Sequence, residues 1–136
     1  MTRTVLMAAI GVAAILAIAP ARADDAPPAP KILAMLLHNE PVSGVPDREA
    51  FMAKIEFPPG STTGKHIHPG DEFATVIAGE LQLNVEGQPP RIVKAGESYH
   101  NLQGVPHETK NISSAPAQTI ATFVVEKGKP LTQPIK

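Results

Sequence analysis

Four side chains in the middle of the chain have the types and the spacing of a metal-binding set. His66 and His68 are two residues apart, so on an extended strand both imidazoles project from the same face. Glu72 follows a Pro-Gly-Asp turn, and His107 follows a second turn at 104–106. Three imidazole nitrogens and one carboxylate oxygen suit Mn, Fe, Co, Ni, Cu or Zn rather than Ca or Mg. The spacing therefore predicts one divalent transition-metal ion.

The elements that must position these residues are short strands. From Lys31 onward, Gly and Pro interrupt short apolar or alternating runs, and no helical periodicity is present. Strands are predicted over residues 51–57, 73–78, 81–85, 91–94, 97–102, 107–112 and 118–125. The strand at 118–125 is nearly apolar on both faces, which predicts that both are covered, and the tail at 128–136 is predicted to be extended along an edge. About eight strands with turns between them indicate an all-β fold, a small antiparallel barrel or jelly roll with room for one small ligand.

The four candidate ligands lie within two longer patterns. Residues 60–79 read Gly, five residues, His-x-His, three residues, Glu, six residues, Gly. Residues 96–111 read Gly, five residues, Leu-x-Gly, two residues, His, three residues, Asn. These patterns resemble the two sequence motifs of the cupin family, with one departure, Leu102, where the family has Pro. The resemblance implies a single-domain cupin jelly-roll β-barrel over residues 31–136, and it assigns the metal to the four residues named above.

The domain size and the ligand set look most like the quercetin-dioxygenase-like cupins. This resemblance implies a metal-dependent dioxygenase or oxidase acting on a small organic molecule, with Glu72 as general base on a substrate hydroxyl. His100 is a surface histidine or a second candidate catalytic residue, as an acid–base group or a group that supports the metal ligands. Alternation alone does not decide whether His100 or Tyr99 faces the barrel. The cavity walls are expected to be Phe57, Phe73, Thr75, Leu83 and Phe123. Cupins usually cover their exposed edge strands by dimerising, so a homodimer is expected.

Other functions fit the same ligands. A non-redox isomerase, decarboxylase or lyase would use them without oxygen, with His100 or Tyr99 carrying a proton. A non-catalytic periplasmic metal- or ligand-binding protein would hold the metal without turnover. Copper-dependent oxidative cleavage of polysaccharides would fit a secreted protein, which the N-terminal residues described below predict. However, the chain has no Trp and only one Tyr with which to stack on sugars. The metal itself is expected to be Cu, Fe, Mn, Ni or Zn; the inherent affinity order favours copper for a chain that acquires its metal outside the cytosol.

The first 23 residues have the features of a secretory signal peptide. Arg3 precedes an uncharged apolar run, and Ala21-Arg22-Ala23 provides small residues at a cleavage site. Residues 24–30 are a Pro/Ala-rich linker. Cleavage would leave 10 basic and 13 acidic residues, a net charge of −3, so neither nucleic acid nor, after cleavage, a membrane is an expected partner. We therefore expect a periplasmic or secreted protein; with no cysteine, it has no disulfide.

Overall fold

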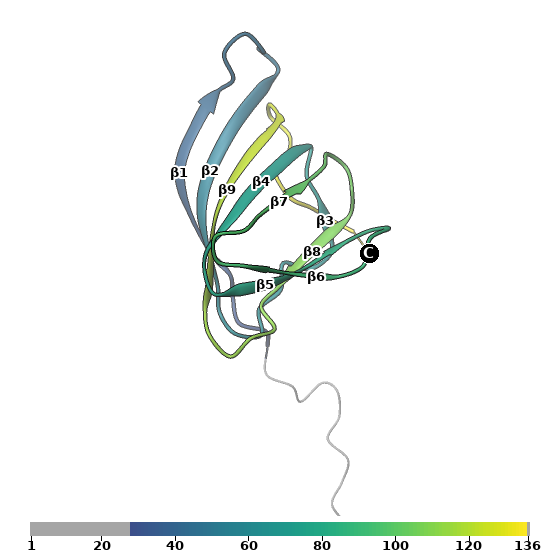
Figure 1. The fold of residues 1–136 in the computed structure, drawn as a ribbon. Coiled ribbons are helices and arrows are strands. Elements are labelled where there is room, and N and C mark those ends of the chain that lie inside the picture. Colours follow the sequence, from purple (N-terminus) through teal and green to yellow (C-terminus); the bar gives the residue numbers. More distant parts are fainter. Residues whose placement is uncertain (1–27, 136) are drawn as a thin grey trace, which may run out of the picture.

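The computed structural model describes residues 28–135, and within them the fold is all-β (Figure 1). The strands are β1 (Leu33–Pro41), β2 (Arg48–Phe57), β3 (His66–Ile67), β4 (Gly70–Ala78), β5 (Glu80–Val85), β6 (Arg91–Lys94), β7 (Ser98–Asn101), β8 (His107–Lys110), β9 (Ala117–Glu126) and β10 (Gln133–Pro134). Over these described residues, no helix is long and apolar enough to cross a membrane. The predicted signal peptide, and residues 24–27 of the predicted linker, lie outside the described residues.

Two five-stranded sheets form the barrel wall. One has the order β1-β2-β9-β4-β7 and the other has the order β10-β3-β8-β5-β6, and all the strand pairs are antiparallel. Figure 1 shows β1, β2, β9 and β4 side by side as one curved layer, with β8, β5 and β6 in the other. Neighbours that are distant in sequence, such as β2 beside β9, give the interleaved order of a jelly roll. The predicted all-β fold is confirmed.

The core lies between the two sheets and follows the alternation of the strands. In β9, every second residue from Ala117 to Val125 is buried, and the residues between them are half-buried. Phe57 of β2, Val76 of β4 and Leu81 of β5 complete the packed interior. The sequence predicted that both faces of 118–125 would be covered, but within this chain only the inner face is buried.

Three strands lie outside the ranges predicted as strands: β1, the two-residue β3 and β10. β1 pairs with β2 and its residues are all exposed. Its sequence, LAMLLHNEP, has no regular alternation, and its register shifts between Leu36 and His38. The tail was predicted to be extended along an edge, and β10 pairs with β3 at the end of the second sheet.

Gly70 separates two of the predicted ligands and allows close approach of two strands. A Cβ at this position would overlap the backbone carbonyl of Val124 in β9. We expect Gly70→Ala to lower the free energy of unfolding by about 3 kcal/mol, because overlap with backbone cannot be relieved by a side-chain rotation. Gly87→Ala is the matched control, since it has a positive φ but open space around it. It should cost only about 1 kcal/mol, so equal midpoint shifts in urea denaturation for the two variants would contradict this account.

Candidate metal centre

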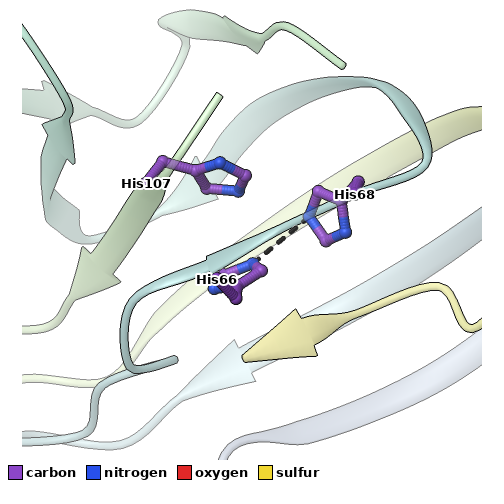
Figure 2. A group of neighbouring side chains, drawn as sticks. All are labelled: His66, His68 and His107. Carbon is purple, nitrogen blue, oxygen red and sulfur yellow. Dashed lines mark hydrogen bonds between the residues drawn. The ribbon is translucent and has the colours of Figure 1, made fainter. Parts of the chain in front are cut away.

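Three histidines meet between the two sheets. His66 opens β3, His68 follows its end, and His107 opens β8. The two short strands pair so that His66 lies opposite His107. The three side chains are buried, with 2–5% of each residue exposed, and one ring nitrogen from each lies within 4.8 Å of the other two. Figure 2 shows the three rings grouped around a common point. The pairing of β3 with β8 therefore brings the two predicted motifs together.

Backbone carbonyls orient all three rings in the same way. The Nδ1–H of His66 donates to the Gly64 carbonyl at 2.9 Å, and that of His107 donates to the Val105 carbonyl at 2.9 Å. His68 donates from Nδ1 to the Leu131 carbonyl at 2.7 Å. With the proton on Nδ1, each Nε2 keeps its lone pair for a metal.

The inward-facing nitrogens lie close to one another. The Nε2 atoms of His66 and His68 are 3.2 Å apart, and two lone pairs at this distance repel unless a proton or a cation lies between them. The Nε2 of His107 is buried without a hydrogen-bond partner. Burial lowers the pKa of His66 and so favours its neutral form, against smaller opposing contributions led by the Gly64 carbonyl. Three imidazoles whose Nε2 atoms gather at one point fit a divalent transition metal.

Glu72 lies beside the three histidines. It is buried in β4, and its Oε2 lies 3.6 Å from the Nε2 of His68 and 3.5 Å from the Nε2 of His107. Asn101 donates from Nδ2 to the same oxygen at 2.8 Å. Burial by itself would raise the pKa of Glu72, but its interactions with the two histidines and Asn101 outweigh burial and lower the pKa to about 2. All four predicted ligands therefore share one site, with Glu72 as a carboxylate.

Asn101 is a site residue that sequence reasoning missed. It lies opposite Glu72 in the β4–β7 pair, and its Oδ1 is buried without a partner. The only signal in the sequence was its place next to the Leu102 turn of the second motif.

A cavity of about 310 Å³ opens beside this centre. Its walls include Ile55, Phe57 and Phe123, with Tyr99 and Thr109 near the centre and Thr132 at the exposed rim. Two of the five predicted wall residues, Phe57 and Phe123, are therefore confirmed.

The other three wall residues were predicted wrongly. Leu83 is in the packed core but does not line the cavity. Phe73 and Thr75 alternate with the inward Glu72 and Ala74 of β4, and so face the outer side of the sheet.

The acid–base role expected for His100 at this centre is not supported by its position. The imidazole lies on the outer face of β7, with 39% of its side chain exposed, and stacks on Phe73 with ring centroids 4.3 Å apart. Its Nε2 lies 3.6 Å from the Asp71 carboxylate. Tyr99 is the neighbour that faces inward, buried and lining the cavity. Burial raises the pKa of Tyr99 far above its ordinary value, so its hydroxyl remains protonated and can donate a hydrogen bond.

The sequence pattern of the cupin domain matches residues 53–128, more than half of the chain. The match spans both motifs and all four residues that meet at the centre. The chain belongs to the cupin family.

Three relatives show the range of proteins that share this cupin domain. The HTH-type transcriptional regulator PuuR of Escherichia coli is 39% identical over 87 residues, 63% of this chain and 44% of the regulator. Oxalate oxidase GF-2.8 of Triticum aestivum is 31% identical over 80 residues, 53% of this chain and 36% of the oxidase. Dimethylsulfoniopropionate lyase DddQ of Ruegeria pomeroyi is 34% identical over 56 residues, 41% of this chain and 28% of the lyase.

The crystal structure of DddQ superposes on this cupin with a TM-score of 0.62 and 23% identity, covering 76% of this chain and 51% of that chain. This likeness supports the fold. The matched segments span less than half the length of each of the three curated relatives.

The departure from the cupin pattern at Leu102 leaves the second motif's turn intact. The Val105 amide donates to the Leu102 carbonyl at 3.2 Å, and Gly104 has a φ of 70°, which only glycine adopts readily. Asn111, the last residue of the motif, donates to the Phe57 carbonyl at 2.8 Å and so ties β8 to β2. The motif therefore keeps its turn without the proline.

The C-terminal segment completes the centre. Leu131 supplies the carbonyl that orients His68, and the Ile135 amide donates to the Lys65 carbonyl at 3.0 Å. We expect removal of residues 129–136 to weaken metal binding by about tenfold to a hundredfold, the effect typical of losing a group that orients a ligand. The measurement is a competition titration against a chromogenic chelator.

A matched variant separates this effect from loss of packing. Leu131→Ala removes a side chain that packs on the core but keeps the backbone carbonyl. It should lower thermal stability and leave metal affinity within about twofold, because the hydrogen bond to His68 remains. An equal loss of affinity in both variants would show that packing, and not the carbonyl, supports the centre.

Proposed function

We propose that this cupin is a metal-dependent enzyme that oxidises a small organic molecule with oxygen. The observation that carries the proposal is the buried set of three Nε2 atoms, aimed at one point beside a cavity large enough for a small ligand. His66, His68, His107 and Glu72 would hold the ion. A bound ion would supply redox and Lewis-acid chemistry to a substrate in the cavity.

The protein residues around the centre have separate tasks. Glu72, held by Asn101, lies where it could accept a proton from a substrate hydroxyl. Tyr99, protonated and on the cavity wall, would donate a hydrogen bond to a substrate oxygen. The apolar wall formed by Phe57 and Phe123 would exclude water from the reacting groups.

The copper, iron, manganese, nickel and zinc ions all suit the donor set, and we propose copper. The reason is the affinity order for nitrogen and oxygen donors, applied to a chain that takes up its metal after export. Export through the predicted signal peptide, and a periplasmic or secreted location, are part of the same proposal. The enclosed centre and the small cavity favour a small molecule over a polysaccharide chain.

A non-redox lyase is the second candidate, and one observation favours it. The chain is similar to the lyase DddQ, at 34% identity over 56 residues. Such chemistry would use the same ligands without consuming oxygen.

An oxygen test separates the two candidates. Metal-loaded protein would be incubated with small phenols, hydroxy acids and monocarboxylates, in air and under argon, while oxygen and substrate are followed together. The proposal predicts substrate loss coupled to oxygen uptake, and no turnover under argon or by the His66→Ala variant. Equal turnover under argon would reject the oxidase in favour of the lyase.

We also propose a homodimer formed through β1. This edge strand exposes apolar side chains, among them Leu33 at 61%, Met35 at 56% and Leu36 at 60%. An unpaired apolar edge favours association, and a second copy can pair with it symmetrically.

Light scattering during gel filtration tests the dimer. Leu36→Glu should convert the dimer to a monomer, because it places a charge within the apolar edge. Ile112→Glu, which changes an equally exposed residue outside the strands, should remain a dimer. A monomeric wild type, or a dimeric Leu36→Glu, would contradict the proposal.

A further inference from the structure

The cavity wall carries almost no charge. Among the described residues that line it, His66, His68 and Glu72 can carry a charge, and Glu72 is the one acidic residue. The others are aliphatic, aromatic or hydroxyl-bearing. Lysine and arginine are absent from this lining. Lys65, which precedes His66 in the first motif, is exposed and pairs with Glu86 at 2.6 Å. Arg91 lines a groove on the outer side together with His100.

This lining limits the charge that a bound molecule can carry. A divalent ion held by three neutral imidazoles and one carboxylate leaves a single net positive charge. One negative group on the substrate neutralises that charge. A second would find no cation on the wall to pair with, and against Phe57 or Phe123 it would be an unpaired buried charge, which is strongly unfavourable.

Two inward hydroxyl-bearing side chains add polar partners near the centre. Tyr99 lies two residues before Asn101 on β7, and Thr109 lies two residues after His107 on β8, so each shares the inward face of its strand with a residue of the site. Both line the cavity. They suit one neutral polar group on the substrate, while Ile55, Phe57 and Phe123 suit an apolar body.

We propose that the substrate is a small monoanion with an apolar body, such as a monocarboxylate or an acidic hydroxyl compound, and that dicarboxylates are rejected. This inference rests on the proposed function. It distinguishes this chain from its wheat relative, because oxalate, which that oxidase is named for, carries two carboxylates.

A pair of probes with the same carbon chain length tests the inference without turnover. Butyrate and succinate each have four carbons but differ by one carboxylate. Calorimetric titration of the metal-loaded protein near pH 7.5 should give a dissociation constant for butyrate at least tenfold lower than for succinate. Equal or tighter binding of succinate would overturn the inference, and so would failure of butyrate to bind.

A variant that adds a cation sharpens the test. Thr132 lies at the exposed rim of the cavity, so Thr132→Lys adds charge without disturbing the core. It should tighten succinate binding by about fivefold or more and leave butyrate binding within about twofold. If the ratio of the succinate and butyrate dissociation constants were the same in this variant as in the wild type, charge would not be the basis of selection.

The two proposals can fail separately. Metal content is measured before each titration, so protein that takes up no metal defeats the proposed function, and this inference falls with it. Metal-loaded protein that prefers succinate defeats only the inference.

Discussion

Replacing His66 by Ala is expected to abolish tight metal binding. Zinc sites with four protein ligands bind with about 10–16 kcal/mol, so one ligand contributes on the order of 3 kcal/mol, a factor of about a hundred or more. The remaining partners cannot compensate, since the Nε2 of His68 and that of His107 are fixed by hydrogen bonds on the other side of each ring. The measurement is metal stoichiometry after dialysis, with circular dichroism to verify folding.

His100→Ala is the matched control for this prediction. It also removes one imidazole from the same domain, but that imidazole is exposed on the outer face and stacks on Phe73. The control should retain its metal. If both variants lost metal equally, or if His66→Ala kept a full equivalent, the site assignment would be wrong.

Glu72→Gln is expected to lower turnover by about a hundredfold to ten-thousandfold at saturating metal, the range typical of losing a positioned general base. The amide is similar in size to the carboxylate but cannot accept a proton from the substrate. It also removes the negative charge that interacts with His68 and His107, so metal affinity should fall as well. The assay follows consumption of whichever substrate the oxygen screen identifies.

Two comparisons make this result decisive. Glu86→Gln changes an exposed carboxylate paired with Lys65 and should retain full turnover. Measuring turnover at saturating metal keeps the site occupied, so that a lower rate reports lost catalysis and not weaker metal binding. Full turnover by Glu72→Gln under these conditions would remove Glu72 from the mechanism and favour a different base.

Much of the fold and the centre could be predicted from the sequence because their signals are local. His66, His68 and Glu72 lie within one turn region, and simple alternation places the two imidazoles on one face. The Gly and Pro positions mark the strand ends, and residues 81–85, 91–94 and 118–125 all lie within observed strands. Joining His107 to the other three required the family motifs, since their contact depends on strand pairing.

The orientation of β7 could not be predicted because its pattern is ambiguous. Tyr99 and His100 both have an apolar ring with a polar atom, so alternation in a four-residue strand does not say which is inside. The register against β4 decides it, because Glu72 lies opposite Asn101, which places Tyr99 on the same inward face.

Parts of the centre depend on contacts between distant segments. The carbonyl that orients His68 comes from Leu131, 63 residues later in the chain, and any residue type can supply a backbone carbonyl. A sequence pattern therefore cannot indicate this hydrogen bond. Phe73 was placed on the wrong face because a continuous apolar strand has no alternation to read.

The most direct test of the metal centre is the metal content of the protein purified aerobically from its own source without chelator or affinity tag. We expect about one equivalent of a transition metal per chain, with copper, iron, manganese or nickel supporting oxygen chemistry and zinc supporting the non-redox candidate. Folded protein that contains no metal and takes up none when it is supplied would contradict the account.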